Sequence, residues 1–236
     1  MLSDRSIVSF FGCMLLVFAG TARAQQVVPD DGDMAERVRA CAACHGSQGA
    51  GTADPYFPRL AGKPAGYLLN QLLAFRNGRR RYPPMNYLLE YLTPGYLQDM
   101  AEYYAAQRPP AAPPAVPTLS KDVLARGEEL VMHGNAERGV PACMSCHGPS
   151  LSGMEPTIPS LLGLRATYVS AQLGAWRYGN RTALAPDCMQ FVASHLTEDD
   201  VHVVAAWLES QPIPHDVAPA ARDSYPLPLS CGSQSQ

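Results

Sequence analysis

The chain has 236 residues, of which 47% are hydrophobic, and its formal net charge is −3 at pH 7. This length and composition are typical of a globular protein with one or two domains and exclude a fibrous or disordered chain. Because basic side chains are not in excess, we expect no nucleic-acid partner. The charge is uneven: residues 25–117 carry +1 and residues 118–236 carry −5. Such a dipole favours orientation toward a charged partner, with an ordinary solvated surface as the alternative.

The first 24 residues have the pattern of an export signal. Arg5 precedes an apolar run at residues 7–19, and Ala-Arg-Ala at residues 22–24 forms a small-residue cleavage site. The run is shorter than the roughly 20 apolar residues that cross a bilayer, and an uncleaved anchor is the alternative. We therefore expect residues 1–24 to be a signal peptide. The mature protein is then expected to be periplasmic, without a transmembrane anchor.

A Cys-x-x-Cys-His pentapeptide at residues 41–45 recurs at residues 143–147. This pattern is the attachment signature of c-type haem. On a helix, the two cysteines and the histidine share one face, so two thiols can bond the porphyrin while the imidazole binds iron. The attachment residues are Cys41, Cys44, His45, Cys143, Cys146 and His147. A redox or zinc CxxC is the alternative for one copy, but two copies favour two covalently bound haem c groups.

An internal repeat surrounds both motifs. Residues 58–62 match residues 159–163. Seven positions between 67 and 80 match residues of the second half at one constant sequence offset, including Arg80 with Arg181. We therefore expect two copies of one domain, at residues 25–108 and 118–236, the second with a C-terminal tail. Residues 109–117 are rich in proline, which favours a semi-rigid polyproline linker between the domains.

Helix signals predict an all-α fold. Successive helices are expected from residue 33 into the first haem motif, at 67–76, 93–107, 120–133, 168–177 and 197–210. Thr93, Ser120 and Thr197 are the expected N-caps of three of them. Gly127 and Trp207 would allow the helices at 120–133 and 197–210 to cross closely, although an ordinary core tryptophan is the simpler interpretation.

The repeat also aligns Met85 with Met189, which lie 40 and 42 residues after their histidines in what we predict to be loops. A thioether opposite the histidine raises the reduction potential of a haem iron. We predict His45 and Met85 as axial ligands of one iron, and His147 and Met189 of the other. Cys188 is an alternative ligand at the second site. Cys188 and Cys231 also remain as a pair, which permits a disulfide in an exported protein.

Further residues are expected around each haem. A haem histidine usually donates its second ring N–H to a carbonyl, and Pro58 and Pro159 are placed for that role. Four arginines that recur in register are candidates for pairing with haem propionates, with exposed surface charge as the alternative. These arginines are Arg76, Arg80, Arg177 and Arg181.

With these motifs the chain resembles the dihaem cytochrome c4 family. The resemblance is carried by the two haem motifs, the Pro-x-Leu-x-Gly segments, the Tyr-x3-Gln-Leu-x2-aromatic-Arg helices and the late methionines. It implies two tandem class I cytochrome c domains related by a pseudo-twofold axis. It also implies periplasmic electron transfer toward terminal oxidases. The Cys188-Met189 pair, the longer linker and the C-terminal tail depart from the family pattern.

The expected function is a one-electron carrier, not an enzyme, that passes electrons from respiratory-chain donors to a terminal oxidase or other acceptor. Its partners would be redox proteins. One alternative is a dihaem redox enzyme of the peroxidase or thiosulfate dehydrogenase type. The other is a cytochrome subunit of a dehydrogenase or oxidase complex. A methionine in both copies and the lack of an evident acid–base cluster favour the carrier.

Overall fold

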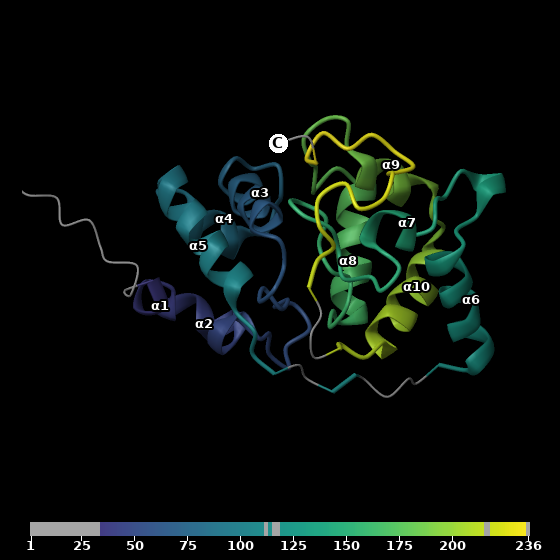
Figure 1. Ribbon diagram of the computed structural model, residues 1–236, viewed down its shortest axis with the longest axis horizontal. Helices are drawn as coiled ribbons and strands as arrows, with labels where there is room; N and C mark the ends of the chain where they lie inside the picture. Colours follow the sequence, from purple (N-terminus) through teal and green to yellow (C-terminus); the bar gives the residue numbers. More distant parts are fainter. Residues whose placement is uncertain (1–33, 111–112, 115–118, 215–217, 235–236) are drawn as a thin grey trace, which may run out of the picture.

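The computed structural model describes residues 34–110, 113–114, 119–214 and 218–234. These residues form two groups of helices that lie side by side (Figure 1). Only isolated bridges, and no β-strand, occur in these ranges, so the all-α prediction is confirmed. The predicted signal peptide and most of the predicted linker lie outside the described residues. Among the helices that are described, none is long and apolar enough to cross a membrane.

The first group of helices covers residues 34–106. Its elements are α1 (Met34–Arg37), η2 (Arg39–Cys41), α2 (Ala42–His45), η3 (Ser47–Gly49), α3 (Ala65–Arg76), α4 (Pro83–Leu89) and α5 (Pro94–Ala106). The Thr93 hydroxyl accepts a hydrogen bond from the Tyr96 N–H at 3.2 Å and caps α5, as predicted. Leu97 and Ala101 on α5 are fully buried against α3. Their burial holds the helices around the first haem motif together.

The second group repeats this plan. Its elements are α6 (Lys121–Met132), η4 (Ala136–Arg138), α7 (Met144–His147), α8 (Ala166–Arg177), α9 (Cys188–His195) and α10 (Glu198–Ser210). Ser120 caps α6. Thr197 and Asp200 form a capping box at the start of α10, in which each side chain accepts from the other's backbone N–H. The predicted starts of α6 and α10 are therefore confirmed.

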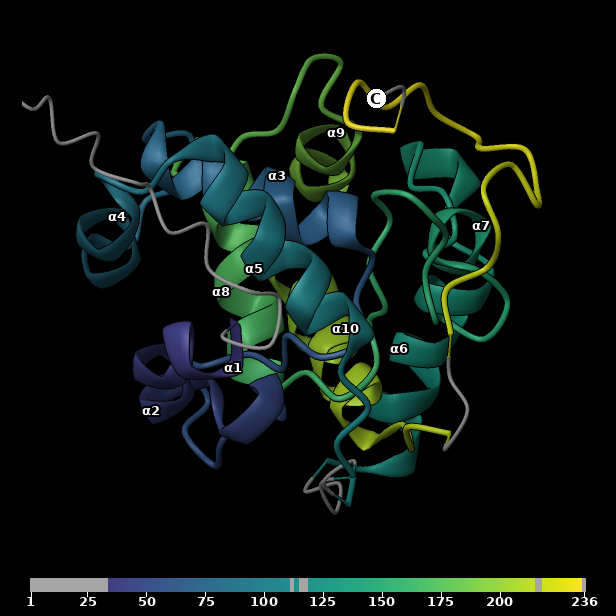
Figure 2. The same ribbon diagram turned by 60° about the vertical axis from the view of Figure 1, so that its left-hand side comes forward.

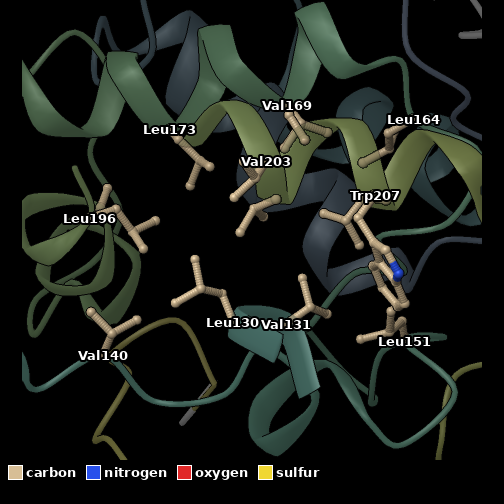
Figure 3. Packing of buried hydrophobic residues seen from close by; sticks show 14 of the residues in the cluster. Leu130, Val131, Val140, Leu151, Leu164, Val169, Leu173, Leu196, Val203 and Trp207 are labelled. Carbon is tan, nitrogen blue, oxygen red and sulfur yellow. The ribbon is translucent and has the colours of Figure 1, made fainter. Parts of the chain in front are cut away.

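Helices α6 and α10 cross closely at Gly127, so the close crossing that Gly127 and Trp207 would allow is present in the structure. A Cβ atom at this position would lie 2.2 Å from the Val203 carbonyl oxygen and 2.8 Å from the Trp207 Cβ atom. Only glycine leaves room for such an approach. The side chains of Leu130, Leu173 and Val203 then point toward a shared interior (Figure 3).

Candidate haem sites

Each haem motif lies on a short helical turn that ends at a glycine. In the first site, α2 contains Cys44 and His45, and Gly46 follows with φ of +75°. A Cβ atom on Gly46 would lie 2.3 Å from the Gly51 carbonyl oxygen. Glycine is therefore required both by the backbone conformation and by the space. Gly148 follows His147 with a φ of +85° in the second site, so the chain leaves both motifs in the same direction.

Both histidines are buried and held by the hydrogen bond that the sequence predicts. The Nδ1 atom of His45 lies 3.0 Å from the Pro58 carbonyl oxygen, and that of His147 lies 2.8 Å from the Pro159 carbonyl oxygen. Since a carbonyl only accepts, each Nδ1 carries the proton and each Nε2 keeps its lone pair for a metal. Burial lowers the pKa of His45 and lowers that of His147 to about 4. Both rings are thus neutral at pH 7, as ligation requires.

The cysteines do not fit the alternative interpretations. Burial raises the pKa of the Cys41 thiol, and it raises the pKa of Cys143 to about 12. A redox-active CxxC needs a lowered thiol pKa. In the part of the chain that the structure describes, no group of three or more His, Cys, Asp or Glu side chains is arranged to hold a metal ion. These residues therefore fit covalent attachment of a porphyrin better than a dithiol or a zinc site.

The two methionines lie in helices, so their predicted placement in loops is wrong. Met85 is in the first turn of α4 and Met189 in the first turn of α9. Prolines at the first two positions of α4 preset its backbone. Asp187 caps α9 by accepting from the Gln190 N–H at 3.0 Å. Both methionines are partly buried and pack against the core of their own half.

Cys188 is joined to Cys231 by a disulfide, with a Cα–Cα distance of 5.2 Å. The disulfide that the sequence permits is therefore present. A disulfide sulfur has no thiolate to offer, so Cys188 cannot serve as an iron ligand while this bond is present. The C-terminal tail folds back far enough to reach α9.

Arg80 and Arg181 meet at the junction of the two halves, where α3 and α8 lie next to each other (Figures 1 and 2). They are 8% and 3% exposed and form an antiparallel bridge. Their guanidinium groups share hydrogen bonds with side chains of both halves. We call this set the cross-domain cluster: Tyr67, Gln71, Arg80, Tyr168, Gln172 and Arg181.

The cross-domain cluster follows the internal repeat. Arg80 donates to Gln71 of its own half at 3.0 Å and to Gln172 of the other half at 2.7 Å. Arg181 donates to Gln172 at 2.9 Å and to Gln71 at 2.7 Å. The two halves are thus related by a pseudo-twofold axis through this cluster. The repeat indicates a shared role for Arg80 and Arg181, but it does not indicate that the two side chains lie in one cluster.

Several buried donors and charges at this junction lack an acidic partner within the described residues. Lys63 is 6% exposed and donates to the Ser160 carbonyl oxygen at 2.9 Å, across the junction. The buried Trp176 Nε1 atom has no hydrogen-bond partner in the described chain. Uncompensated buried cations are costly. Haem propionates would supply both the missing negative charge and an acceptor, so the residues present fit the cofactor.

The other two candidate arginines are placed differently. Arg76 donates to the Leu92 carbonyl oxygen at 3.0 Å, a backbone contact within its own half. The Arg177 side chain makes no hydrogen bond or ion pair with the described residues. Neither joins the cross-domain cluster. Lys63 has no basic counterpart in the second half, where Leu164 occupies the matching position, so the repeat gave no signal for it.

Known proteins agree with this architecture. The model of the cytochrome c family matches residues 23–108. The chain is 38% identical to a thiosulfate dehydrogenase electron acceptor from Thiomonas intermedia (strain K12), over 73% of this chain and 79% of that one. It is 35% identical to a cytochrome c4 from Pseudomonas aeruginosa, over 73% of this chain and 84% of that one.

Solved structures give the same result. Reduced cytochrome c4 from Pseudomonas stutzeri is 30% identical, with a TM-score of 0.66 that covers 77% of this chain and 98% of that chain. A thiosulfate dehydrogenase from Marichromatium purpuratum is 34% identical, with a TM-score of 0.69 over 77% of this chain and 40% of that chain. Both Cys-x-x-Cys-His motifs fit covalently bound haem c, and the cofactor prediction of two haem c groups is confirmed. The chain belongs to the cytochrome c4 family.

Proposed function

We propose that the protein is a one-electron carrier in which each haem iron lies between a histidine nitrogen and a methionine sulfur. The ligand pairs are His45 with Met85 and His147 with Met189. The observation that carries this proposal is the repetition: in both halves a buried histidine is fixed by a carbonyl, and a methionine lies in the first turn of a short helix packed on the same core. Two sites built alike favour the same ligation in both.

Bound haem supplies the one-electron chemistry, and the chain sets the conditions for it. Pro58 and Pro159 fix the tautomer and orientation of the two imidazoles. Thioether ligands raise the reduction potential, and with both axial positions filled no site is left for a substrate. We infer further that Arg80, Arg181 and Lys63 pair with haem propionates at the junction. The chain would then neutralise its buried cations with the cofactor's own carboxylates.

The ligation is tested by replacing each methionine with leucine in the ferric holoprotein. Wild type is expected to show a sulfur-to-iron charge-transfer band from both haems. Met85→Leu and Met189→Leu should each remove about half of that band, and Met100→Leu, a core methionine on α5, should leave it unchanged. A variant of Met85 or Met189 that keeps the full band would contradict the assignment.

We propose a thiosulfate dehydrogenase as the electron donor. Two relatives are named thiosulfate dehydrogenase electron acceptors, at 38% and 36% identity. The structural match to a thiosulfate dehydrogenase covers 40% of that chain, so the enzyme contains much that this chain lacks. The test mixes the oxidised holoprotein with thiosulfate, with and without a purified thiosulfate dehydrogenase. Reduction is expected only when the enzyme is present, and reduction by thiosulfate alone would instead favour an enzymatic role.

We further propose that the carrier works in the periplasm after removal of residues 1–24. The charge pattern and cleavage motif of those residues support this. N-terminal sequencing of the holoprotein from a periplasmic extract should begin at Gln25. A holoprotein that begins at Met1 and sediments with membranes would contradict it.

A further inference from the structure

The segment at residues 218–234, which we call the C-terminal strap, crosses the second haem site and reaches from α7 to α9 (Figures 1 and 2). The first half has no equivalent, because its chain enters the proline-rich linker directly after α5. The strap contains no helix or strand of its own. Its path is therefore set by its contacts with the second half.

On the attachment side, the strap contacts the haem motif and the loop that follows it. The Tyr225 hydroxyl donates to the Cys146 carbonyl oxygen at 3.2 Å. A Cβ atom on Gly148 would lie 3.0 Å from that same hydroxyl oxygen. Ala220 donates to the Gly153 carbonyl oxygen at 2.9 Å and accepts from the Glu155 N–H at 2.9 Å. These contacts fix the first part of the strap against the segment that holds the porphyrin.

On the methionine side, the strap is attached covalently. Cys231 is bonded to Cys188, the first residue of α9, and Met189 is the next residue. The Gly232 N–H donates to the Pro186 carbonyl oxygen at 3.0 Å. A Cβ atom at Gly232 would lie 2.1 Å from the Ala185 carbonyl oxygen, so the strap lies directly against the loop that leads into α9. The two sides of the haem site are thus joined by one short segment.

The first site lacks this connection. There the Cys44 carbonyl oxygen accepts from Thr52, only eight residues away, at 3.3 Å. The helix that carries Met85 exposes its outer face, with Tyr87 76% and Leu88 60% exposed. Nothing in the described chain joins α4 to the first haem motif as the strap joins α9 to the second. The two sites are alike in their ligands but differ in how their methionine is held.

We propose that the C-terminal strap is a positioning element that holds Met189 at the second iron and so keeps small exogenous ligands off it. This rests on the proposed ligation of that iron by His147 and Met189. An external ligand binds only after Met189 has left, which requires the first turn of α9 to move. The disulfide at the neighbouring residue restrains that movement. When a smaller fraction of the molecules has Met189 away from the iron, the apparent affinity for the external ligand falls by the same factor.

The test uses imidazole as the probe and the ferric holoprotein with both haems. The variant Cys188→Ser/Cys231→Ser removes the bond without leaving a free thiol beside the iron. It is expected to bind imidazole at one haem at least ~tenfold more tightly than wild type, with loss of half of the sulfur-to-iron band. Methionine methyl NMR signals, assigned with Met85→Leu and Met189→Leu, identify the haem involved, which should be the second.

Two further variants complete the design. Ser230→Ala changes the exposed neighbour of Cys231 and keeps the disulfide, so its imidazole affinity should equal that of wild type. Tyr225→Phe removes only the hydroxyl contact with Cys146 and should tighten imidazole binding at the second haem about threefold. It also tests the proposal if the double variant does not fold.

Unchanged imidazole affinity at the second haem in Tyr225→Phe and in the folded double variant would overturn the role of the strap. A loss of methionine ligation at the first haem instead of the second would do the same. If His147 and Met189 were not the ligands of the second iron, the result would look different, because wild type itself would then lack the methyl signal of an iron-bound Met189. The first haem serves as an internal control in every sample.

Discussion

Replacing Gly127 with alanine should destabilise the second half of the protein and leave the first half intact. The new methyl group would lie 2.2 Å from the Val203 carbonyl oxygen and 2.8 Å from the Trp207 Cβ atom. A backbone oxygen cannot rotate away, so α6 and α10 must separate. Overpacking costs about 1–3 kcal/mol, and so close an approach to a backbone atom belongs to the upper part of that range, about 2–3 kcal/mol. The better helix propensity of alanine returns about 1 kcal/mol.

The net loss in unfolding free energy is therefore about 1–2 kcal/mol, a fall in melting temperature of roughly 5–15 °C for a domain of this size. Guanidinium unfolding of the holoprotein, followed by circular dichroism and by the methionine methyl signals, should show earlier loss of Met189 alone. Gly95→Ala is the matched control, because a Cβ there meets nothing within 4 Å. If Gly127→Ala unfolds at or above the wild-type guanidinium concentration, the close crossing is refuted.

Two further predictions concern charge. Burial acts to raise the pKa of Asp200, but hydrogen bonds from Arg138 and Thr197 outweigh it and lower the pKa to about 2. Because the pKa of Asp200 is lower in the folded state, wild type should be about 1–2 kcal/mol more stable than Asp200→Asn above pH 4 and should lose this advantage toward pH 2. Urea unfolding at several pH values measures the difference in unfolding free energy. A difference that stays constant with pH would contradict this prediction. Burial lowers the pKa of Lys63 to about 8, so the group is mainly charged at pH 7. Lys63→Met removes this charge and should lower the reduction potential of the second haem by on the order of tens of millivolts in a spectroelectrochemical titration. The reason is that the cation binds the Ser160 carbonyl oxygen, and the carbonyl of the preceding residue, Pro159, holds His147. The exposed Lys121→Met is the control, and equal shifts in both variants would contradict this role.

The haem-attachment side of each site could be predicted from the sequence because the chemistry is local. Two thiols and an imidazole at fixed spacing define the motif, and a carbonyl about a dozen residues later reaches the histidine in both halves. The helix caps at Thr93, Ser120 and Thr197 are also local, since each depends on a hydroxyl and a backbone N–H three residues away.

What the sequence did not predict depends on contacts between distant residues. Arg80 and Arg181 lie far apart in the chain, and recurrence indicated a shared role but not that they meet. Lys63 is unmatched in the repeat, so its burial against Ser160 had no signal. The loop predicted at Met189 is a helix, because Asp187 caps α9 through a hydrogen bond that the sequence pattern does not reveal. Composition left the pairing of Cys188 with Cys231 open, since whether a tail folds back is a question of tertiary contacts.

The NMR spectrum of the reduced holoprotein with labelled methionine methyl groups tests most directly whether each iron lies between a histidine and a methionine. A methyl group held over a haem face is shifted far from the others by the ring current. The chain has nine methionines, of which seven follow residue 24 and belong to the mature holoprotein. Two of these seven should show the shift, and they should be Met85 and Met189. One shifted methyl or none would contradict two haems that each lie between an imidazole and a thioether.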